Sequence, residues 1–152
     1  MKILILSDNH SRRIDFNLNE YDYVIHCGDY GDEDGILDGC GALYVRGNCD
    51  YRGPKEILSN ILGKNVLITH GDLYNVKYHY NSIVYKALEK KCDFVFFGHT
   101  HRADMFIEDS IIFINPGSYQ NGYYVIINDK SIDFYRYDEI YKSFDYRWWL
   151  IW

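Results

Sequence analysis

A side chain able to bind a metal ion follows each of five short apolar runs in this sequence. Nearly continuous runs of aliphatic, β-branched and aromatic residues are typical of strands buried on both faces of a sheet. Four of the five motifs that follow these runs also contain a glycine. The seven side chains are Asp8, His10, Asp29, Asn48, His70, His99 and His101.

These seven side chains are expected to converge, although they span residues 8–101. In open α/β sheets the carboxyl ends of the strands gather at one edge, and ligands bind there. Imidazole, carboxylate and amide groups together suit Mn, Fe, Zn, Co or Ni, whereas Mg and Ca prefer more oxygen ligands. Seven ligands are too many for one tetrahedral ion and suit two ions, with Asp29 as the natural bridge.

Each motif taken alone has an ordinary structural explanation. The Asp-x-His motif suits a loop carboxylate beside a surface histidine, the Gly-Asp motif suits a turn, and His70 suits a buried structural histidine. His99 and His101 are more specific, because alternate residues at a strand end point to the same side. The occurrence of all five motifs in order, each at a strand end, favours a metal centre.

The remaining pattern predicts an α/β protein. Strands are predicted over KILIL, YDYVIHC, ALYV, NVLIT, DFVFF, IIFI, YYVII and IDFYRY. Apolar residues at helical spacing, with lysines in the last turn, predict a helix over 78–91, and a shorter helix is predicted between residues 11 and 20. Turns at 108–110 and 128–130 predict two hairpins. We therefore expect two sheets packed face to face, with helices outside.

The composition indicates one globular domain over residues 1–152. A net charge of −6 argues against nucleic acid as a partner. The apolar start is too short for a signal peptide and no run approaches a membrane span, so we expect a cytoplasmic protein with no membrane contact. The four cysteines lack C-x-x-C spacing and are expected to be free thiols.

The five motifs resemble those of the calcineurin-like metallophosphoesterase superfamily. That family carries D-x-H, G-D, G-N-[HC]-[DE], H and G-H-x-H in this order. Here they read DNH (8–10), GD (28–29), GNCD (47–50), THG (69–71) and GHTH (98–101). VRGNCD and INPGS (114–118) are typical of the small single-domain phosphodiesterase-like branch, and the resemblance extends to about residue 137.

The resemblance implies a four-layer αββα sandwich of two mixed sheets with helices outside. It implies two divalent metal ions per chain, with Mn ahead of Ni, Fe, Zn or Co. The first ion would be held by Asp8, His10, Asp29 and His101, and the second by Asp29, Asn48, His70 and His99. The implied activity is that of a phosphodiesterase, in which a metal-activated hydroxide attacks a small phosphodiester.

Cys49 departs from the pattern of larger relatives, in which the residue after the Asn is a His that protonates the leaving group. A thiol can donate a proton, but it is a poorer donor than imidazolium. Asn115 is expected to shape a loop beside the site, and His26 and His79 are expected to be structural. Arg46 and Arg102 flank site motifs and either bind phosphate or form surface ion pairs.

The aromatic tail, residues 145–152, lies outside the resemblance and contains all three tryptophans. Exposure of three tryptophans is costly, so we expect the tail to pack on its own domain or, as the second choice, to form a homo-oligomer contact. The alternative to an enzyme is a catalytically weak protein-binding scaffold of the same fold, like the retromer subunit. All seven ligand positions are filled here, which favours the enzyme.

Overall fold

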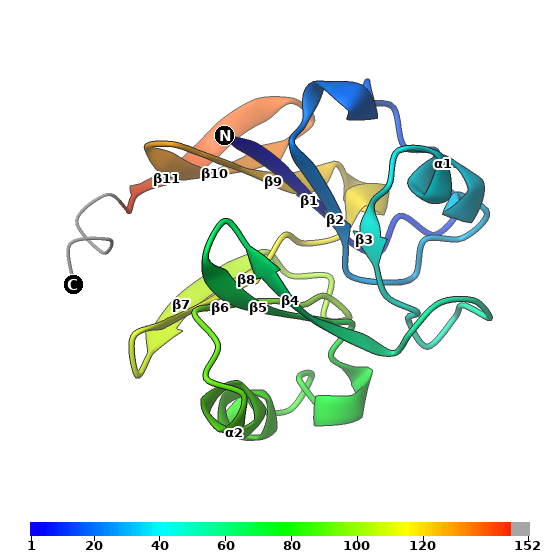
Figure 1. Cartoon of the computed structure of the whole chain (residues 1–152). Coiled ribbons are helices and arrows are strands. Elements are labelled where there is room, and N and C mark those ends of the chain that lie inside the picture. Colours follow the sequence, from blue (N-terminus) through cyan, green and yellow to red (C-terminus); the bar gives the residue numbers. More distant parts are fainter. Residues whose placement is uncertain (147–152) are drawn as a thin grey trace.

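The computed structural model describes residues 1–146, which form two mixed β-sheets packed face to face (Figure 1). The first sheet has the strand order β11-β10-β9-β1-β2-β3. Its strands are β1 (Lys2–Leu6), β2 (Tyr23–His26), β3 (Leu43–Tyr44), β9 (Tyr123–Asn128), β10 (Ser131–Arg136) and β11 (Glu139–Asp145). The second sheet has the order β4-β5-β6-β8-β7. Its strands are β4 (Glu56–Ile61), β5 (Lys64–Thr69), β6 (Phe94–Phe96), β7 (Asp104–Glu108) and β8 (Ile111–Asn115).

Each sheet contains three neighbouring parallel strands. These are β1, β2 and β3 in the first sheet and β5, β6 and β8 in the second. The strands β9, β10 and β11 extend the first sheet in antiparallel fashion, and β4 and β7 flank the second. Parallel strands end at the same edge of a sheet. The segments that follow β1, β2 and β3 therefore start from one edge of the first sheet, and those that follow β5 and β6 start from one edge of the second.

Three apolar clusters define four layers, as the expected αββα sandwich requires. The largest cluster lies between the sheets and includes Ile5, Ile68 and Phe96. The helix α1 (Asp34–Gly39) buries Leu37 against the outer face of the first sheet. The helix α2 (Asn81–Glu89) buries Ile83, Val84 and Ala87 against the second sheet, and the two helices lie on opposite sides of the sandwich (Figure 1). The expected fold class is confirmed.

All eight predicted strand segments contain strands, α2 lies inside the predicted helix 78–91, and both predicted hairpins form. The sequence pattern does not predict α1, β4 or β11. Helix α1 has only six residues, two of them glycine, which gives little helical periodicity. All seven residues of β11 are exposed, so the alternation that indicates a half-buried strand is lost.

The predicted helix between residues 11 and 20 is wrong. Only a 3₁₀ turn, η1 (Leu18–Glu20), forms there. Ile14 and Leu18 are buried, and the backbone N–H of Asp15 donates to the hydroxyl of Tyr119, so the segment is an irregular loop held by the rest of the fold. Two further 3₁₀ turns are η2 (Asp72–Tyr74) and η3 (Tyr119–Asn121).

Asp145 and Tyr146 are the only residues of the predicted tail that the structure describes; residues 147–152 lie outside it. Tyr146 is buried, and its hydroxyl donates to the backbone carbonyl of Asn128. All four cysteines, which lie within residues 1–146, are free thiols, as expected. Within the described part of the chain, no helix is both long and apolar enough to cross a membrane.

Candidate metal centre

The structure brings all seven predicted side chains to one end of the sandwich, where they come from both sheets. Asp8 and His10 follow β1, Asp29 follows β2, and Asn48 follows β3. His70 follows β5, and His99 and His101 follow β6. The centre therefore lies across the two parallel strand groups, at the carboxyl ends of their strands, as the sequence predicts.

One group of side chains meets around the two histidines His10 and His101. The Nε2 atoms of these rings are 3.3 Å apart. Oδ1 of Asp8 lies 3.3 Å from Nε2 of His101 and 3.9 Å from Nε2 of His10. Oδ2 of Asp29 lies 3.9 Å from Nε2 of His10. Four N and O atoms thus face a common centre.

A second group meets around His70. Its Nε2 atom is 2.9 Å from Oδ1 of Asn48, 3.2 Å from Oδ2 of Asp29 and 3.2 Å from Nδ1 of His99. On the other side of the ring, Nδ1 is 2.7 Å from the carbonyl oxygen of Cys27, to which it donates. Nε2 thus faces the group. The same Asp29 oxygen belongs to both groups, because Oδ2 faces His10 as well as His70.

The backbone around these residues is unusual. Asp8, His10, Asp29, His99 and His101 all have positive φ angles, between 45° and 72°. The left-handed region costs a residue other than glycine on the order of 1–3 kcal/mol. Such strain persists only where the surrounding structure imposes it, and it clusters at functional sites. The orientation of five of the seven side chains therefore depends on a strained backbone conformation, which the rest of the fold must stabilise.

Asp8 supplies the observation that tests whether these residues fit metal ions. Its side chain is fully buried, yet Oδ1 accepts no hydrogen bond within residues 1–146. That oxygen faces the Nε2 atoms of three histidines, at 3.3 to 3.9 Å. A buried carboxylate oxygen without a partner is costly unless it is paired or coordinates a metal. The donor set fits a divalent cation.

The other Asp8 oxygen is firmly held. Oδ2 accepts from the hydroxyl of Ser7 at 2.6 Å and from the backbone N–H of His99 at 3.0 Å. The hydroxyl of Ser118 donates to the Asp8 carbonyl at 2.8 Å. The sequence did not identify either serine as a site residue, although Ser118 is the last residue of the INPGS motif. Together these bonds leave Oδ1 as the Asp8 oxygen that faces the centre.

Asp50 organises the loop that carries Asn48. Its Oδ2 accepts from the backbone N–H groups of Asp29, at 2.7 Å, and Gly47, at 2.8 Å. Oδ1 of Asp29 in turn accepts from the backbone N–H of Cys49 at 2.9 Å. The GNCD motif is thereby tied to the GD motif through the backbone, which explains why an acidic residue ends the motif.

His26 is structural, as expected, and it supports the first motif from behind. Its Nε2–H donates to Oδ1 of Asn9 at 2.7 Å, and its Nδ1 accepts from the backbone N–H of Gly28 at 3.0 Å. Complete burial lowers the pKa of His26 to about 3, so the ring is neutral. The side-chain N–H₂ of Asn9 donates to the carbonyls of Arg12 and Tyr30. Asn9 therefore fixes the loop that carries Asp8 and His10.

The charges of the centre are strongly coupled. Burial alone would lower the pKa of His70, but the hydrogen bond with Asp29 and the charges of Asp8 and Asp29 outweigh it and raise that pKa to about 9. Burial would raise the pKa of Asp29, but the hydrogen bond with His70 and the charge of that ring lower it. Without bound cations, the two carboxylates thus retain a proton on an imidazole.

Cys49 lies at the exposed side of the centre, beside Asn48, which is also exposed. Burial and the negative charge of Asp29 raise the pKa of the Cys49 thiol, so it is protonated at neutral pH. One sulfur, one His10 nitrogen and one Asp29 oxygen lie within 4.8 Å of one another. The protonated thiol therefore lies close to His10 and Asp29.

Two polar grooves border the centre. One is lined by Arg46, Asn48, Lys55 and Asp72, and the other by Lys77, His79 and Arg102. Lys77 is near enough for its charge to lower the pKa of His99, although burial of that ring contributes more. Asn115, the residue expected to shape the loop, donates to the carbonyl of Gly98 at 3.2 Å and so holds the GHTH motif.

Comparisons with known proteins identify the family. The family model of the calcineurin-like phosphoesterase superfamily domain matches residues 1–126. The probable metallophosphoesterase YsnB of Bacillus subtilis is 33% identical over 126 residues, which cover 78% of this chain and 75% of the relative. The phosphodiesterase MJ0936 of Methanocaldococcus jannaschii is 28% identical over 145 residues, which cover 77% of this chain and 83% of the relative.

Solved structures agree with this assignment. A predicted phosphoesterase from Streptococcus pneumoniae superposes with a TM-score of 0.80 at 26% identity, covering 95% of this chain and 97% of that one. Vps29 from Entamoeba histolytica, solved with Zn²⁺, has a TM-score of 0.75 at 18% identity, covering 97% of this chain and 100% of that one. The second likeness is one of fold alone. The chain belongs to the calcineurin-like phosphoesterase superfamily.

Proposed function

We propose that this protein is a dinuclear metal-dependent phosphodiesterase acting on a small phosphodiester. The observation that carries the proposal is the convergence of seven N and O ligands from both sheets, with one oxygen of Asp29 shared between two groups. Asp8, His10, Asp29 and His101 would hold one ion, and Asp29, Asn48, His70 and His99 the other. Mn²⁺ is the first ion to test, followed by Ni²⁺, Fe²⁺, Zn²⁺ and Co²⁺.

Bound divalent ions would supply positive charge that neutralises phosphate oxygens and lowers the pKa of water, the basis of two-metal hydrolysis at neutral pH. The chain's own residues hold that charge in place. Ser7 and the backbone of His99 fix the Asp8 carboxylate, and the Cys27 carbonyl fixes the ring of His70. Such preorganised groups need no rearrangement during the reaction.

Cys49 is proposed as the group that protonates the leaving oxygen. Larger relatives carry a His at this position, and here the protonated thiol lies beside Asn48 at the exposed side. Because a thiol is a weak hydrogen-bond donor, substrates whose leaving group needs little protonation should react best. In this proposal Cys49 donates a proton and does not bind a metal ion.

The surroundings favour a compact anionic substrate. Lys77 and Arg102 line a groove beside His99 and His101, and the wall of this groove also contains the carboxylate of Asp104. A negatively charged substituent of the substrate would be attracted there. The overall charge of −6 disfavours a long polyanion such as nucleic acid. The MJ0936 relative, named as a phosphodiesterase, supports a diester in preference to a monoester.

A metal-supplemented hydrolysis assay tests the proposal. The purified protein, stripped of metal and reloaded with Mn²⁺, should hydrolyse an activated aryl phosphodiester faster than the matching monoester. Asp29→Asn should lose at least about a hundredfold in rate, because metal ligands contribute several kcal/mol to charge stabilisation. Asp32→Asn is the matched control, since Asp32 is an exposed carboxylate three positions away.

The assay also separates the enzyme from a protein-binding scaffold of the same fold. Metal binding by the wild-type protein without turnover of either ester would contradict the proposed activity and support the scaffold. Vps29 shares the fold at 18% identity. Faster hydrolysis of the monoester would retain the two-metal mechanism and overturn the diester preference.

A further inference from the structure

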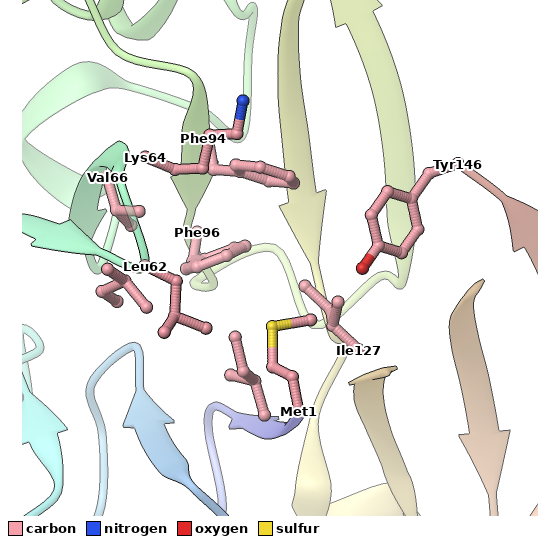
Figure 2. A pocket seen from close by; sticks show the side chains of 10 residues that line it. Met1, Leu62, Lys64, Val66, Phe94, Phe96, Ile127 and Tyr146 are labelled. Carbon is pink, nitrogen blue, oxygen red and sulfur yellow. The ribbon is translucent and has the colours of Figure 1, made fainter. Parts of the chain in front are cut away.

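An apolar cavity lies between the two sheets, away from the candidate metal centre. Its volume is about 140 Å³, and its walls include Met1, Ile3, Leu62, Phe96 and Tyr146. Figure 2 shows side chains from separate parts of the chain facing one another across it, with Met1 and Leu62 on one side and Tyr146 on another. Ile3, Val66 and Phe94 belong to the amino-terminal parts of β1, β5 and β6, whereas the metal-centre motifs follow the carboxyl ends of these strands.

The cavity is suited to one aromatic or branched aliphatic side chain. An apolar cavity of about 150 Å³ lined by Leu, Ile and Phe stays dry and accepts a benzene-sized group. Here Ile3, Val66 and Phe96 are almost fully buried in the wall, whereas Leu62 is 58% exposed at the mouth. Leu62 therefore presents an apolar side chain to solvent beside a space that water fills poorly.

The described chain ends at this cavity. Tyr146 lines its wall, is 4% exposed, and is fixed by its hydroxyl bond to the carbonyl of Asn128. The next six residues of the sequence are Arg147, Trp148, Trp149, Leu150, Ile151 and Trp152. Six residues reach up to roughly 20 Å, so this segment starts at the wall and can span the cavity and its mouth.

The neighbouring surface is also apolar. Phe144 pairs with Ile132 across β11 and β10, and Ile132 belongs to the core between the sheets, so Phe144 is on the inward face. Phe144 is nonetheless 38% exposed, because β11 is the edge strand of the first sheet. Tyr146, two residues along, joins this exposed surface to the cavity.

We propose that the cavity is a docking site for residues 147–152 of the same chain, one of whose apolar side chains enters it. The attachment at Tyr146 makes the docking intramolecular, so it does not depend on the protein concentration. The segment covers Leu62 and Phe144, and the cavity receives a side chain of the size that it fits. The interaction is independent of the proposed catalytic function, because it lies at the other end of the strands.

Intrinsic fluorescence tests this proposal on the intact protein without a label. The chain has three tryptophans, Trp148, Trp149 and Trp152, and all three lie in this segment. Tryptophan emission therefore reports on this segment alone. In the wild-type protein we expect emission at shorter wavelength than free tryptophan and protection from acrylamide quenching. Leu62→Glu places a charge at the mouth of the cavity and should shift the emission to longer wavelength, with loss of that protection.

Leu88→Glu is the matched control, because Leu88 is 41% exposed on α2, on the outer side of the second sheet. It should leave emission and quenching unchanged, and circular dichroism should be the same for both variants and the wild type. Wild-type tryptophans that are quenched like free tryptophan would overturn the proposal, as would an unchanged spectrum in Leu62→Glu. Protection that is lost on dilution would place the segment in a second copy and overturn the intramolecular docking.

Discussion

At the scale of single residues, His26 shows how a buried neutral ring is used to hold a loop. Nε2–H donates to Asn9, Nδ1 accepts from Gly28, and burial lowers the pKa of the ring to about 3. Protonation would remove the acceptor at Nδ1 and place a charge in the interior. The bonds that support the loop between Asp8 and His10 thus depend on the neutral form.

His26 should make the protein less stable in acid. The unfolded chain takes up a proton near pH 6.5, whereas the native ring stays neutral down to about pH 3. Stability contributed by the neutral form is therefore complete above pH 6.5 and falls as the pH is lowered, by about 2 kcal/mol at pH 5. Urea unfolding of wild type and His26→Gln at pH 7 and pH 5 measures this contribution.

His26→Gln keeps a donor for Asn9 but leaves the Gly28 N–H unpaired, so it should be about 1–3 kcal/mol less stable at pH 7. Its stability should fall less between pH 7 and pH 5 than that of the wild type. An equal fall in both proteins would mean that His26 titrates normally in the folded state.

Substitution of Cys49 should change the rate of hydrolysis without changing the amount of bound metal. Cys49→His should speed hydrolysis of diesters with poor leaving groups, because imidazolium is the stronger donor, and Cys49→Ser should slow them. General acid catalysis contributes about 10²–10⁴-fold, so the effect should be small for activated aryl esters and large for alkyl esters. Rates for a series of leaving groups, with bound metal measured in each variant, provide the test. Equal losses for all leaving groups in Cys49→Ser would exclude the donor role.

At the scale of elements, the turns after the strands decide how closely the ligands approach. A Cβ on Gly98 would overlap Oγ of Ser7 and lie 2.6 Å from Oδ2 of Asp8, and a Cβ on Gly47 would meet the carboxylate of Asp29. The glycines of these motifs are thus needed because backbone from one strand end passes against a carboxylate from another. Asp8 and Asp29 themselves have positive φ angles, of 52° and 57°.

Gly98→Ala should weaken metal binding without unfolding the protein. The new methyl group must push the Asp8 carboxylate or the GHTH motif aside, and a misplaced ligand typically lowers metal affinity about 10–100-fold. Gly35→Ala is the matched control, because no atom lies within 4 Å of a Cβ there and alanine favours the helix α1. Metal titration by calorimetry compares the two. Unchanged affinity in Gly98→Ala would show that the turn has room to relax.

The elements also show what sequence can predict. The runs that form β1, β2, β5 and β6 are buried on both faces, and their apolar composition predicted the strands. The polar residues that follow these runs predicted the position of the site. The helix expected between residues 11 and 20 failed because Ile14 and Leu18 are buried by tertiary packing in a loop. Asn9 and Asp50 act through hydrogen bonds to backbone from distant segments, which spacing along the chain does not encode. Ser7 acts through a bond to the neighbouring carboxylate of Asp8, and an isolated serine carries no recognisable pattern.

At the scale of the whole molecule, the candidate ligands connect the two sheets. Asp8, His10, Asp29 and Asn48 follow strands of the first sheet, and His70, His99 and His101 follow strands of the second. The shared core, with Ile5 and Ile68 in one cluster, connects the same two layers. We therefore propose that residues 1–152 unfold as one domain and that metal binding stabilises both sheets together.

Thermal unfolding with and without Mn²⁺ tests this coupling. A ligand at a hundred times its dissociation constant adds about 2.7 kcal/mol if it binds only the folded state. For a chain of this size that corresponds to a rise in Tm of about 5–10 °C, seen as one transition by both tyrosine absorbance and far-ultraviolet circular dichroism. Asp29→Asn should lose most of the rise because it removes the oxygen shared by both groups, whereas Asp32→Asn should keep it. Two separate transitions, or a rise of equal size in Asp29→Asn, would contradict a metal centre that joins the sheets.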